Sequence, residues 1–271
     1  MPRPSLRTLA AALLLALAGA AQAQCTRALK VPVAPIGLAV TVVDGQVGGI
    51  YPELLRAEAA RVGCTIDFQV VPRARQEMLF ATGQADLLMP ARRSARRDAE
   101  GIFVLMIRSR AELMWLEPRQ LPVHSVAELL QHDELRVGVV RGYDYDASYQ
   151  TLMQQLAARK RLTEATDPSS LARMLDAGIV DLAVVTPLAV TGALRSDAKL
   201  RPLIERLHTE PAEELGWGES GAYVSPSAAL SEADRQLALQ MLEHIGRSGA
   251  AWHAFQRYYP DSNLSESVRP R

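Results

Sequence analysis

Several arginines follow a short apolar stretch in the first part of the chain. Leu87–Met89 is typical of a strand buried on both faces, and we expect Pro90 to end that strand. Ser94 is a suitable N-cap for a helical turn that carries Arg96 and Arg97. Ligands bind at the carboxyl ends of strands in open parallel sheets, and a helix start with an arginine favours an anion. The sequence therefore predicts an anion-binding corner at this point.

The composition excludes several classes of protein. The chain has 271 residues, of which 48% are hydrophobic and 22% charged, a balance typical of globular and not of disordered proteins. Lys plus Arg and Asp plus Glu both number 30, so no bulk charge indicates nucleic acid or an acidic membrane surface as a partner. The length is sufficient for one large domain or two modest ones.

The first residues have the pattern of a secretory signal peptide. Arg3 and Arg7 precede an apolar run over residues 9–18, and Ala21 and Ala23 supply the small residues of a cleavage site. A membrane span needs about 20 apolar residues, so this run is too short for an anchor. We predict removal of residues 1–23 and a periplasmic location. The loss of two arginines leaves the mature chain with a net charge of −2.

Two cysteines in an exported chain suggest a disulfide. Cys25 comes just before a strand expected over residues 28–33, and Cys64 just before one expected over 65–71. If these strands are parallel neighbours, their starts meet and one bridge joins them. The alternative, two unpaired buried thiols, is disfavoured in an oxidising compartment. Two cysteines and five scattered histidines have no metal-ligand spacing, so we expect neither a metal nor a cofactor.

Strands and helices alternate along the chain in two successive parts. The first part has expected helices over residues 53–62 and 76–82 between its strands, and a hairpin at Asp44-Gly45. The second opens with a capping box at Ser125 and Glu128 and has expected strands over 135–140 and 180–185, with a helix over 170–177 just before the latter. This order is typical of a parallel sheet with right-handed crossovers.

A short motif recurs at matching places in the two parts. Gly83-Gln84-Ala85-Asp86-Leu87 and Gly178-Ile179-Val180-Asp181-Leu182 each follow a helix and open a strand that ends at a proline. The recurrence favours two lobes of like architecture. Residues 107–116 and 214–224 are predicted to be extended crossings between them. The last helix, over 231–245, is expected to pack back on the first lobe.

These motifs resemble those of the family 3 bacterial extracellular solute-binding proteins, the periplasmic receptors of polar amino-acid ABC transporters. Five motifs occur in the family's order, and they cover essentially the whole mature chain. They are Gly48–Leu54, Gly83–Met89, Ser94–Arg97 followed by Phe103, Val137–Gly142, and Asp181–Pro187.

The resemblance implies a two-lobed α/β architecture, the type II periplasmic binding protein fold. Each lobe would be a mainly parallel sheet flanked by helices, and two hinge crossings would join the lobes. The expected divisions are a signal peptide at 1–23, lobe I at 24–107 and 221–271, lobe II at 112–214, and crossings at 108–111 and 215–220.

The resemblance also implies a ligand site. The family's arginine that clamps a substrate carboxylate matches Arg97, with the Ser94 hydroxyl beside it, because a planar guanidinium binds a carboxylate bidentately. The alternative is that Arg97 belongs to a solvated basic run. The further expected ligand-binding residues are Arg73 and Pro90 in lobe I and Gly142, Tyr143, Asp144 and Thr186 in lobe II.

One departure from the family pattern bears on the solute. Thr186 stands where the family usually has an aspartate that pairs with the substrate's ammonium, and threonine supplies no charge. A pocket that gains arginine and loses an acid is expected to prefer a carboxylate-bearing solute, such as a dicarboxylate or an acidic amino acid. If Asp144 or Glu219 replaced the missing acid, an ordinary amino acid would fit instead.

The expected activity is capture of that solute by hinge closure, with no catalysis. The closed form of a monomer would be recognised by the membrane permease of an ABC importer. One alternative is a periplasmic enzyme on the same fold, as in the cyclohexadienyl dehydratases, but the chain offers no convincing catalytic set. Another is a ligand-sensing subunit of a signalling system.

Overall fold

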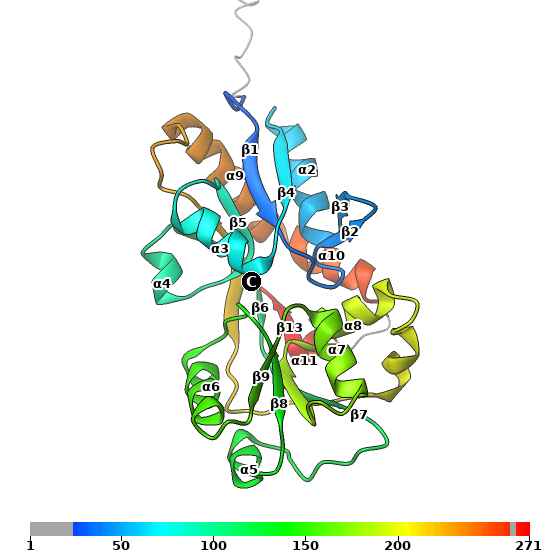
Figure 1. Ribbon diagram of the computed structural model, residues 1–271. Coiled ribbons are helices and arrows are strands. Elements are labelled where there is room, and N and C mark those ends of the chain that lie inside the picture. Colours follow the sequence, from blue (N-terminus) through cyan, green and yellow to red (C-terminus); the bar gives the residue numbers. More distant parts are fainter. Residues whose placement is uncertain (1–23, 261–263) are drawn as a thin grey trace, which may run out of the picture.

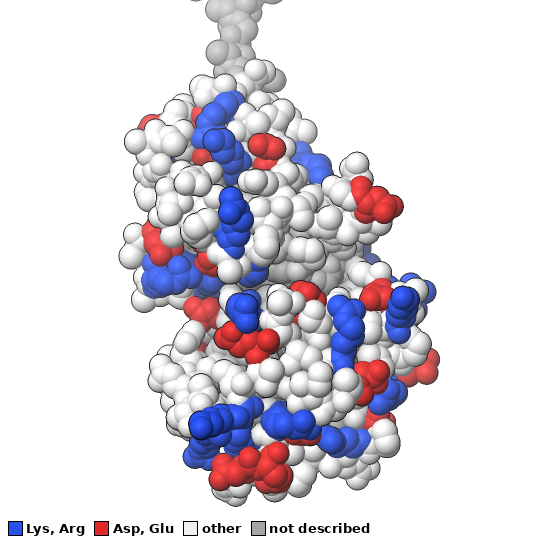
Figure 2. Space-filling view, in the orientation of Figure 1, with Lys and Arg blue, Asp and Glu red and all other residues white. Residues whose placement is uncertain are grey.

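The computed structural model describes residues 24–260 and 264–271 and has two lobes, one above the other in Figure 1. The signal peptide predicted over residues 1–23 lies outside the described residues. Among the residues described, no helix is both long and apolar enough to cross a membrane. Figure 2 shows basic and acidic side chains interspersed over the visible face of both lobes, as expected from equal numbers of the two charges.

The first lobe is built on two groups of strands. β1 (Leu29–Val33) pairs in parallel with β4 (Ile66–Val70), and the Asp86 amide, just before β5 (Leu87–Arg92), donates to the carbonyl of Lys30 in β1 at 2.9 Å. β5 continues into an antiparallel group with β12 (Gly218–Val224), β6 (Ile102–Ser109) and β13 (Val268–Pro270). The parallel pairing of β1 and β4 was predicted, and the disulfide between Cys25 and Cys64 is present where their starts meet.

Helices cover this lobe. They are α2 (Ile50–Arg61), α3 (Arg73–Ala81), α4 (Ala95–Asp98), α9 (Glu232–Arg247), α10 (Ala250–Tyr258) and α11 (Leu264–Ser267). The predicted hairpin at Asp44-Gly45 joins β2 (Thr41–Val43) to β3 (Gln46–Gly48). Two helices begin three residues earlier than predicted, at Ile50 and at Arg73. The earlier start places Arg73 in the first turn of α3, where it reaches the space between the lobes.

The second lobe has one five-stranded sheet. Its order is β11 (Leu207–Glu210), β7 (Glu112–Leu116), β10 (Leu182–Val185), β8 (Val137–Val140) and β9 (Leu162–Ala165). The helices are α5 (Val126–Gln131), α6 (Ala147–Ala158), α7 (Pro168–Asp176) and α8 (Pro187–Ser196), with a 3₁₀ helix over Arg201–Arg206. β10, β8 and β9 pair in parallel, whereas β7 and β11 are antiparallel to their neighbours. In both lobes, the antiparallel part contains the strands that cross between lobes.

The two copies of the Gly-x-x-Asp-Leu motif have the same structural role. The Asp86 carboxylate accepts a hydrogen bond from the Lys30 amide at 2.7 Å, and the Asp181 carboxylate accepts one from the Arg136 amide at 2.7 Å. Each buried carboxylate thus fixes the start of a neighbouring parallel strand. Burial alone would raise the pKa of Asp181, but hydrogen bonds from Arg136 and Arg119 outweigh it and lower the pKa to about 2. The motif serves lobe assembly, and neither aspartate lines the pocket between the lobes that is described below.

Two strand-to-strand connections join the lobes. β6 leads to β7 through Arg110 and Ala111, and β11 leads to β12 through residues 211–217. β12 and β13 both pair with the end of β6, where Gly218 and Val268 lie opposite Ser109. The C-terminus is therefore held at the level where the two lobes meet (Figure 1).

Candidate ligand-binding pocket

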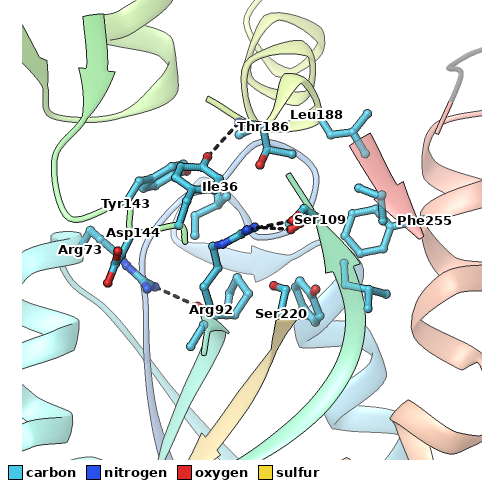
Figure 3. A pocket seen from close by; sticks show the side chains of 18 of the residues that line it. Ile36, Arg73, Arg92, Ser109, Tyr143, Asp144, Thr186, Leu188, Ser220 and Phe255 are labelled. Atoms are coloured by element: carbon cyan, nitrogen blue, oxygen red, sulfur yellow. Dashed lines mark hydrogen bonds between the residues drawn. The ribbon is translucent and has the colours of Figure 1, made fainter. Parts of the chain in front are cut away.

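A pocket opens between the lobes at the carboxyl end of β5. Its cavity volume is about 110 Å³, which is several times the volume that one water molecule needs. Both lobes contribute to the wall, which Figure 3 shows from close by. The polar lining residues are Arg73, Arg92, Arg97, Ser109, Asp144, Thr186 and Ser220. The ring-bearing ones, proline apart, are Tyr51, Tyr143, Tyr145, Phe255 and Tyr259.

Arg92 extends across the middle of this pocket (Figure 3). Its Nη1 donates to the Ser109 hydroxyl at 2.7 Å and its Nη2 to the Ser109 carbonyl at 2.8 Å. The guanidinium carbon lies 4.4 Å from the centre of the Tyr145 ring, within the range of a cation–π contact. Desolvation by burial lowers the pKa of Arg92. Among the described residues, Arg92 forms no ion pair with a carboxylate.

Arg97 has different surroundings. It is only 1% exposed, and its Nε and Nη2 donate to the two carboxylate oxygens of Glu77 at 3.0 and 2.9 Å. Its Nη1 donates to the carbonyl of Arg92 at 2.8 Å. The bidentate fork expected to clamp a solute thus holds a carboxylate of the protein itself. Arg97 still lines the pocket, and it fixes the backbone from which Arg92 projects.

Glu77 is shared by two more arginines. Arg73 lies 2.7 Å from one carboxylate oxygen and Arg96 2.9 Å from the other. Burial would raise the pKa of Glu77, but the charges of Arg73 and Arg97 and the hydrogen bonds from Arg97 and Arg96 outweigh it and lower the pKa to about 2. This group, which we call the Glu77 cluster, comprises Glu77, Arg73, Arg96 and Arg97. It fixes the lobe I rim of the pocket.

Ser94 does not line the pocket. Its hydroxyl accepts a hydrogen bond from the Arg97 amide at 3.4 Å, so it is the predicted N-cap of α4. Glu219, one of the two acids considered as replacements for the missing aspartate, also lies outside the lining and pairs with Arg93 at 3.1 Å.

The other predicted residues come together at the pocket. Arg73 and Pro90 line it from lobe I, and Gly142, Tyr143, Asp144 and Thr186 line it from lobe II. The prediction that Pro90 ends its strand was wrong, because β5 continues to Arg92. The pairing of β5 with β12 shifts register between Gly221 and Tyr223, and a proline is tolerated at such a bulge because no ladder donor is needed there.

The lobe II wall lies close against lobe I. Gly142 has a φ of 78°, a left-handed conformation that favours glycine, and a Cβ added there would lie 3.2 Å from the Cγ of Arg73. The Tyr259 hydroxyl donates to the carbonyl of Leu188 in α8 at 2.9 Å. The Thr186 hydroxyl donates to the carbonyl of Arg110, in the first crossing, at 3.1 Å. Contacts between the lobes therefore border the pocket on this side.

Tyr143 carries a buried polar group without a partner. Among the described residues, its hydroxyl has no hydrogen-bond partner, and burial raises its pKa. An unpaired buried hydroxyl costs about 1–3 kcal/mol, so a polar atom of a bound solute would relieve it.

Several lining residues were not predicted from the sequence. No local pattern distinguishes Arg92 from the arginines that follow it, although the rule that ligands bind at strand ends selects it once β5 extends two residues beyond Pro90. Tyr51, Phe255 and Tyr259 come from helices far apart in the sequence, and no local pattern distinguishes them from core residues.

The sequence matches no family model and no curated protein. The structure matches several solved ones. A histidine kinase sensor domain with similarity to periplasmic binding proteins has a TM-score of 0.66 at 18% identity, covering 87% of this chain and 96% of that one. EhuB, solved in complex with hydroxyectoine, has a TM-score of 0.68 at 16% identity, covering 85% of this chain and 87% of that one.

A third match is AbpA from Streptococcus pneumoniae, an amino acid ABC transporter substrate-binding protein solved with L-arginine. Its TM-score is 0.66 at 18% identity, and the match covers 85% of this chain and 94% of that one. The protein thus has the two-lobed type II periplasmic binding protein fold, as the motifs predicted.

Proposed function

We propose that this protein is a periplasmic receptor that captures a small carboxylate-bearing solute and presents it to the membrane permease of an ABC importer. The observation that carries the proposal is the lining of the pocket between the lobes. Three arginines, Arg73, Arg92 and Arg97, border it against a single acidic residue, Asp144. A wall of that composition attracts an anion of a size that two lobes can enclose.

The mechanism we propose is closure of the lobes around the solute. A solute that touches both lobes binds the closed form more tightly than the open one and shifts the population toward it by that difference. Lobe I would contribute Arg73 and Arg92, and lobe II Tyr143, Asp144 and Thr186, while Arg97 borders the pocket with its guanidinium bound to Glu77. The bond from Thr186 to the Arg110 carbonyl couples the lobe II wall to a crossing, and so links the pocket to the hinge.

A sensing role is the second candidate. It is favoured by the similarity to a histidine kinase sensor domain, whose fold the chain shares over 87% of its length. In that case the closed form would be recognised by a signalling partner in place of a permease, and the pocket would serve the same purpose.

A thermal-shift screen of the purified protein tests the proposal. Amino acids, dicarboxylates and aromatic acids would be compared, each beside its uncharged amide. A ligand at 100 times its dissociation constant adds about 2.7 kcal/mol to the free energy of unfolding, so binding raises the melting temperature. We expect at least one carboxylate to do so and its amide not to. The proposal would be overturned if no carboxylate shifted the transition, or if the amides shifted it equally.

A further inference from the structure

Arg92 lies at the centre of the pocket without an ion-pair partner among the residues that the structure describes. Ser109 binds two of its guanidinium nitrogens and the Tyr145 ring covers one side, so the orientation is fixed while further N–H groups remain. Gly218 makes room for it, because a Cβ there would collide with Nη2. A guanidinium that is held rigidly and has no carboxylate is pre-organised for an external one.

The three arginines of the pocket lining differ in their ion pairs. Arg73 and Arg97 both pair with Glu77, at 2.7 and 2.9 Å. Arg92 feels the charges of Asp146 and Asp144 of lobe II but forms no ion pair with either. A monocarboxylate would supply the ion-pair partner that Arg92 lacks among the described residues, whereas the second acid of a dicarboxylate would meet only guanidiniums that Glu77 already binds.

The pocket wall has few counter-charges and free hydrogen-bond acceptors for an ammonium group. Asp144 is the one carboxylate that lines the described pocket, and it already accepts a hydrogen bond from the Gln150 side chain. The Thr186 hydroxyl donates its proton to the Arg110 carbonyl and carries no charge. A desolvated ammonium needs both a counter-charge and several acceptors, so these groups disfavour an α-amino acid.

The rest of the wall is apolar and rich in rings. The lining includes Tyr51, Phe255, Ile107, Leu188 and Val268. Figure 3 shows Phe255 and Leu188 beyond Ser109 as seen from Arg92. Tyr51 and Phe255 meet edge to face, with ring centres 5.8 Å apart. Surfaces of this kind favour an aromatic or branched apolar body, because stacking and apolar burial both contribute to binding.

We infer that Arg92 binds the carboxylate of the solute and that the solute is an apolar, ring-bearing monocarboxylate without an α-ammonium group. This inference rests on the proposed function and specifies its substrate class. The carboxylate lies at the hinge end, against the N–H groups of Arg92 that Ser109 leaves free, and the apolar body lies among the rings. Tyr143, with its unpaired hydroxyl, is available to any polar substituent of that body.

Calorimetric titration of the purified protein with matched compounds tests the solute class. The probes are 3-phenylpropionate, L-phenylalanine, which adds the ammonium, succinate, which exchanges the ring for a second acid, and 3-phenylpropionamide, which lacks the charge. We expect 3-phenylpropionate to bind at least tenfold more tightly than the other three. Tighter binding of L-phenylalanine or succinate would overturn the inference and leave the proposed function intact. If no carboxylate in this set or in the thermal screen bound, both would fail.

Substitutions at neighbouring arginines test the assignment of Arg92. Arg92→Met keeps much of the side chain and removes the charge, and we expect its affinity for 3-phenylpropionate to fall about 100-fold or more. The matched control is Arg93→Met at the next position, where the side chain is 51% exposed and lies outside the pocket lining; we expect its affinity to be unchanged. Equal affinities of Arg92→Met and the unaltered protein would overturn the assignment.

A second variant covers the case in which Arg92→Met fails to fold. Arg92→Lys keeps the charge and loses the planar fork, so we expect a folded protein with roughly tenfold weaker binding. Circular dichroism of each variant separates loss of fold from loss of affinity. Full affinity in a folded Arg92→Lys would contradict a bidentate role for Arg92.

Discussion

Arg92 and Arg97 lie on either side of one strand-to-helix turn, yet their guanidiniums have opposite surroundings. Arg97 binds both carboxylate oxygens of Glu77, at 3.0 and 2.9 Å, and is only 1% exposed. Arg92 binds a hydroxyl and a carbonyl of Ser109 and forms no ion pair within the described chain. The arginines of the Glu77 cluster have a carboxylate partner within the protein, whereas Arg92 has no ion-pair partner among the described residues.

The difference between the two arginines predicts that one region contributes to the stability of the fold and the other to ligand binding. Removing one partner from the Glu77 cluster leaves a buried charge unpaired and lowers the stability of the fold. Altering the region around Arg92 leaves the internal ion pairs as they are and changes what the pocket attracts. Substitutions in the Glu77 cluster are therefore expected to alter the free energy of unfolding, and those around Arg92 to alter affinity.

The largest effect is expected from Glu77→Gln. The change removes the carboxylate that Arg73, Arg96 and Arg97 share, so we expect the free energy of unfolding to fall by about 3–5 kcal/mol. Urea denaturation followed by circular dichroism measures it. Glu100→Gln is the control, since within residues 24–260 and 264–271 Glu100 pairs with the exposed Arg96 alone, and we expect a change within about 0.5 kcal/mol. Similar losses in both variants would contradict the central place of Glu77.

Acid should weaken the same region. The pKa of Glu77 is lowered from 4.5 to about 2, so its ionised form stabilises the folded state above pH 4.5, and this stabilisation is lost as pH falls toward 2. The shift corresponds to about 3 kcal/mol. We expect the difference in unfolding free energy between the unaltered protein and Glu77→Gln to shrink as the pH is lowered. A difference that stays constant between about pH 5 and about pH 3 would show that Glu77 is not the titrating group.

Arg97→Lys should have an intermediate effect on stability. Lysine keeps the charge but loses the fork that binds Glu77 and the bond to the Arg92 carbonyl, so we expect a loss of about 2 kcal/mol. The control is Arg96→Lys, whose side chain is 52% exposed and whose loss should stay within about 0.5 kcal/mol. Chemical denaturation measures both. If the two variants lost equal stability, burial of the Arg97 fork would not matter.

The smallest effect is expected from Ser109→Ala. It removes one hydrogen bond that orients Arg92, so binding of the preferred carboxylate should weaken about three- to tenfold, while stability changes by less than about 1 kcal/mol. Calorimetric titration gives the affinity. Ser148→Ala, on the exposed side of α6, is the matched control. Unchanged affinity in Ser109→Ala would mean that the Tyr145 ring and the Ser109 carbonyl suffice to orient Arg92.

The elements that local patterns specify were predicted well. The Gly-x-x-Asp-Leu motif marked equivalent strands, the parallel pairing of β1 with β4 brought Cys25 and Cys64 together, and Ser94 caps α4 as expected. These features depend on periodicity, capping and neighbouring strands, all of which act over a few residues or between adjacent elements.

The pocket was predicted only in part, because some of its lining residues are far apart in the sequence. Arg73, Tyr143, Asp144 and Thr186 were found because motifs near strand ends mark them. Phe255 lies in α10 and Tyr259 just after it, near the end of the chain, and nothing in their local sequence separates a pocket wall from a core.

The sequence by itself determined two lobes with a similar order of strands and helices, a disulfide and an arginine-rich corner, because short local patterns specify each of them. Only the tertiary structure decided which arginine is paired. Glu77 is twenty residues from Arg97, and its side chain reaches the guanidinium only once α3 packs beside α4. An ion pair depends on which groups share a desolvated space, and that space exists only after the chain has folded.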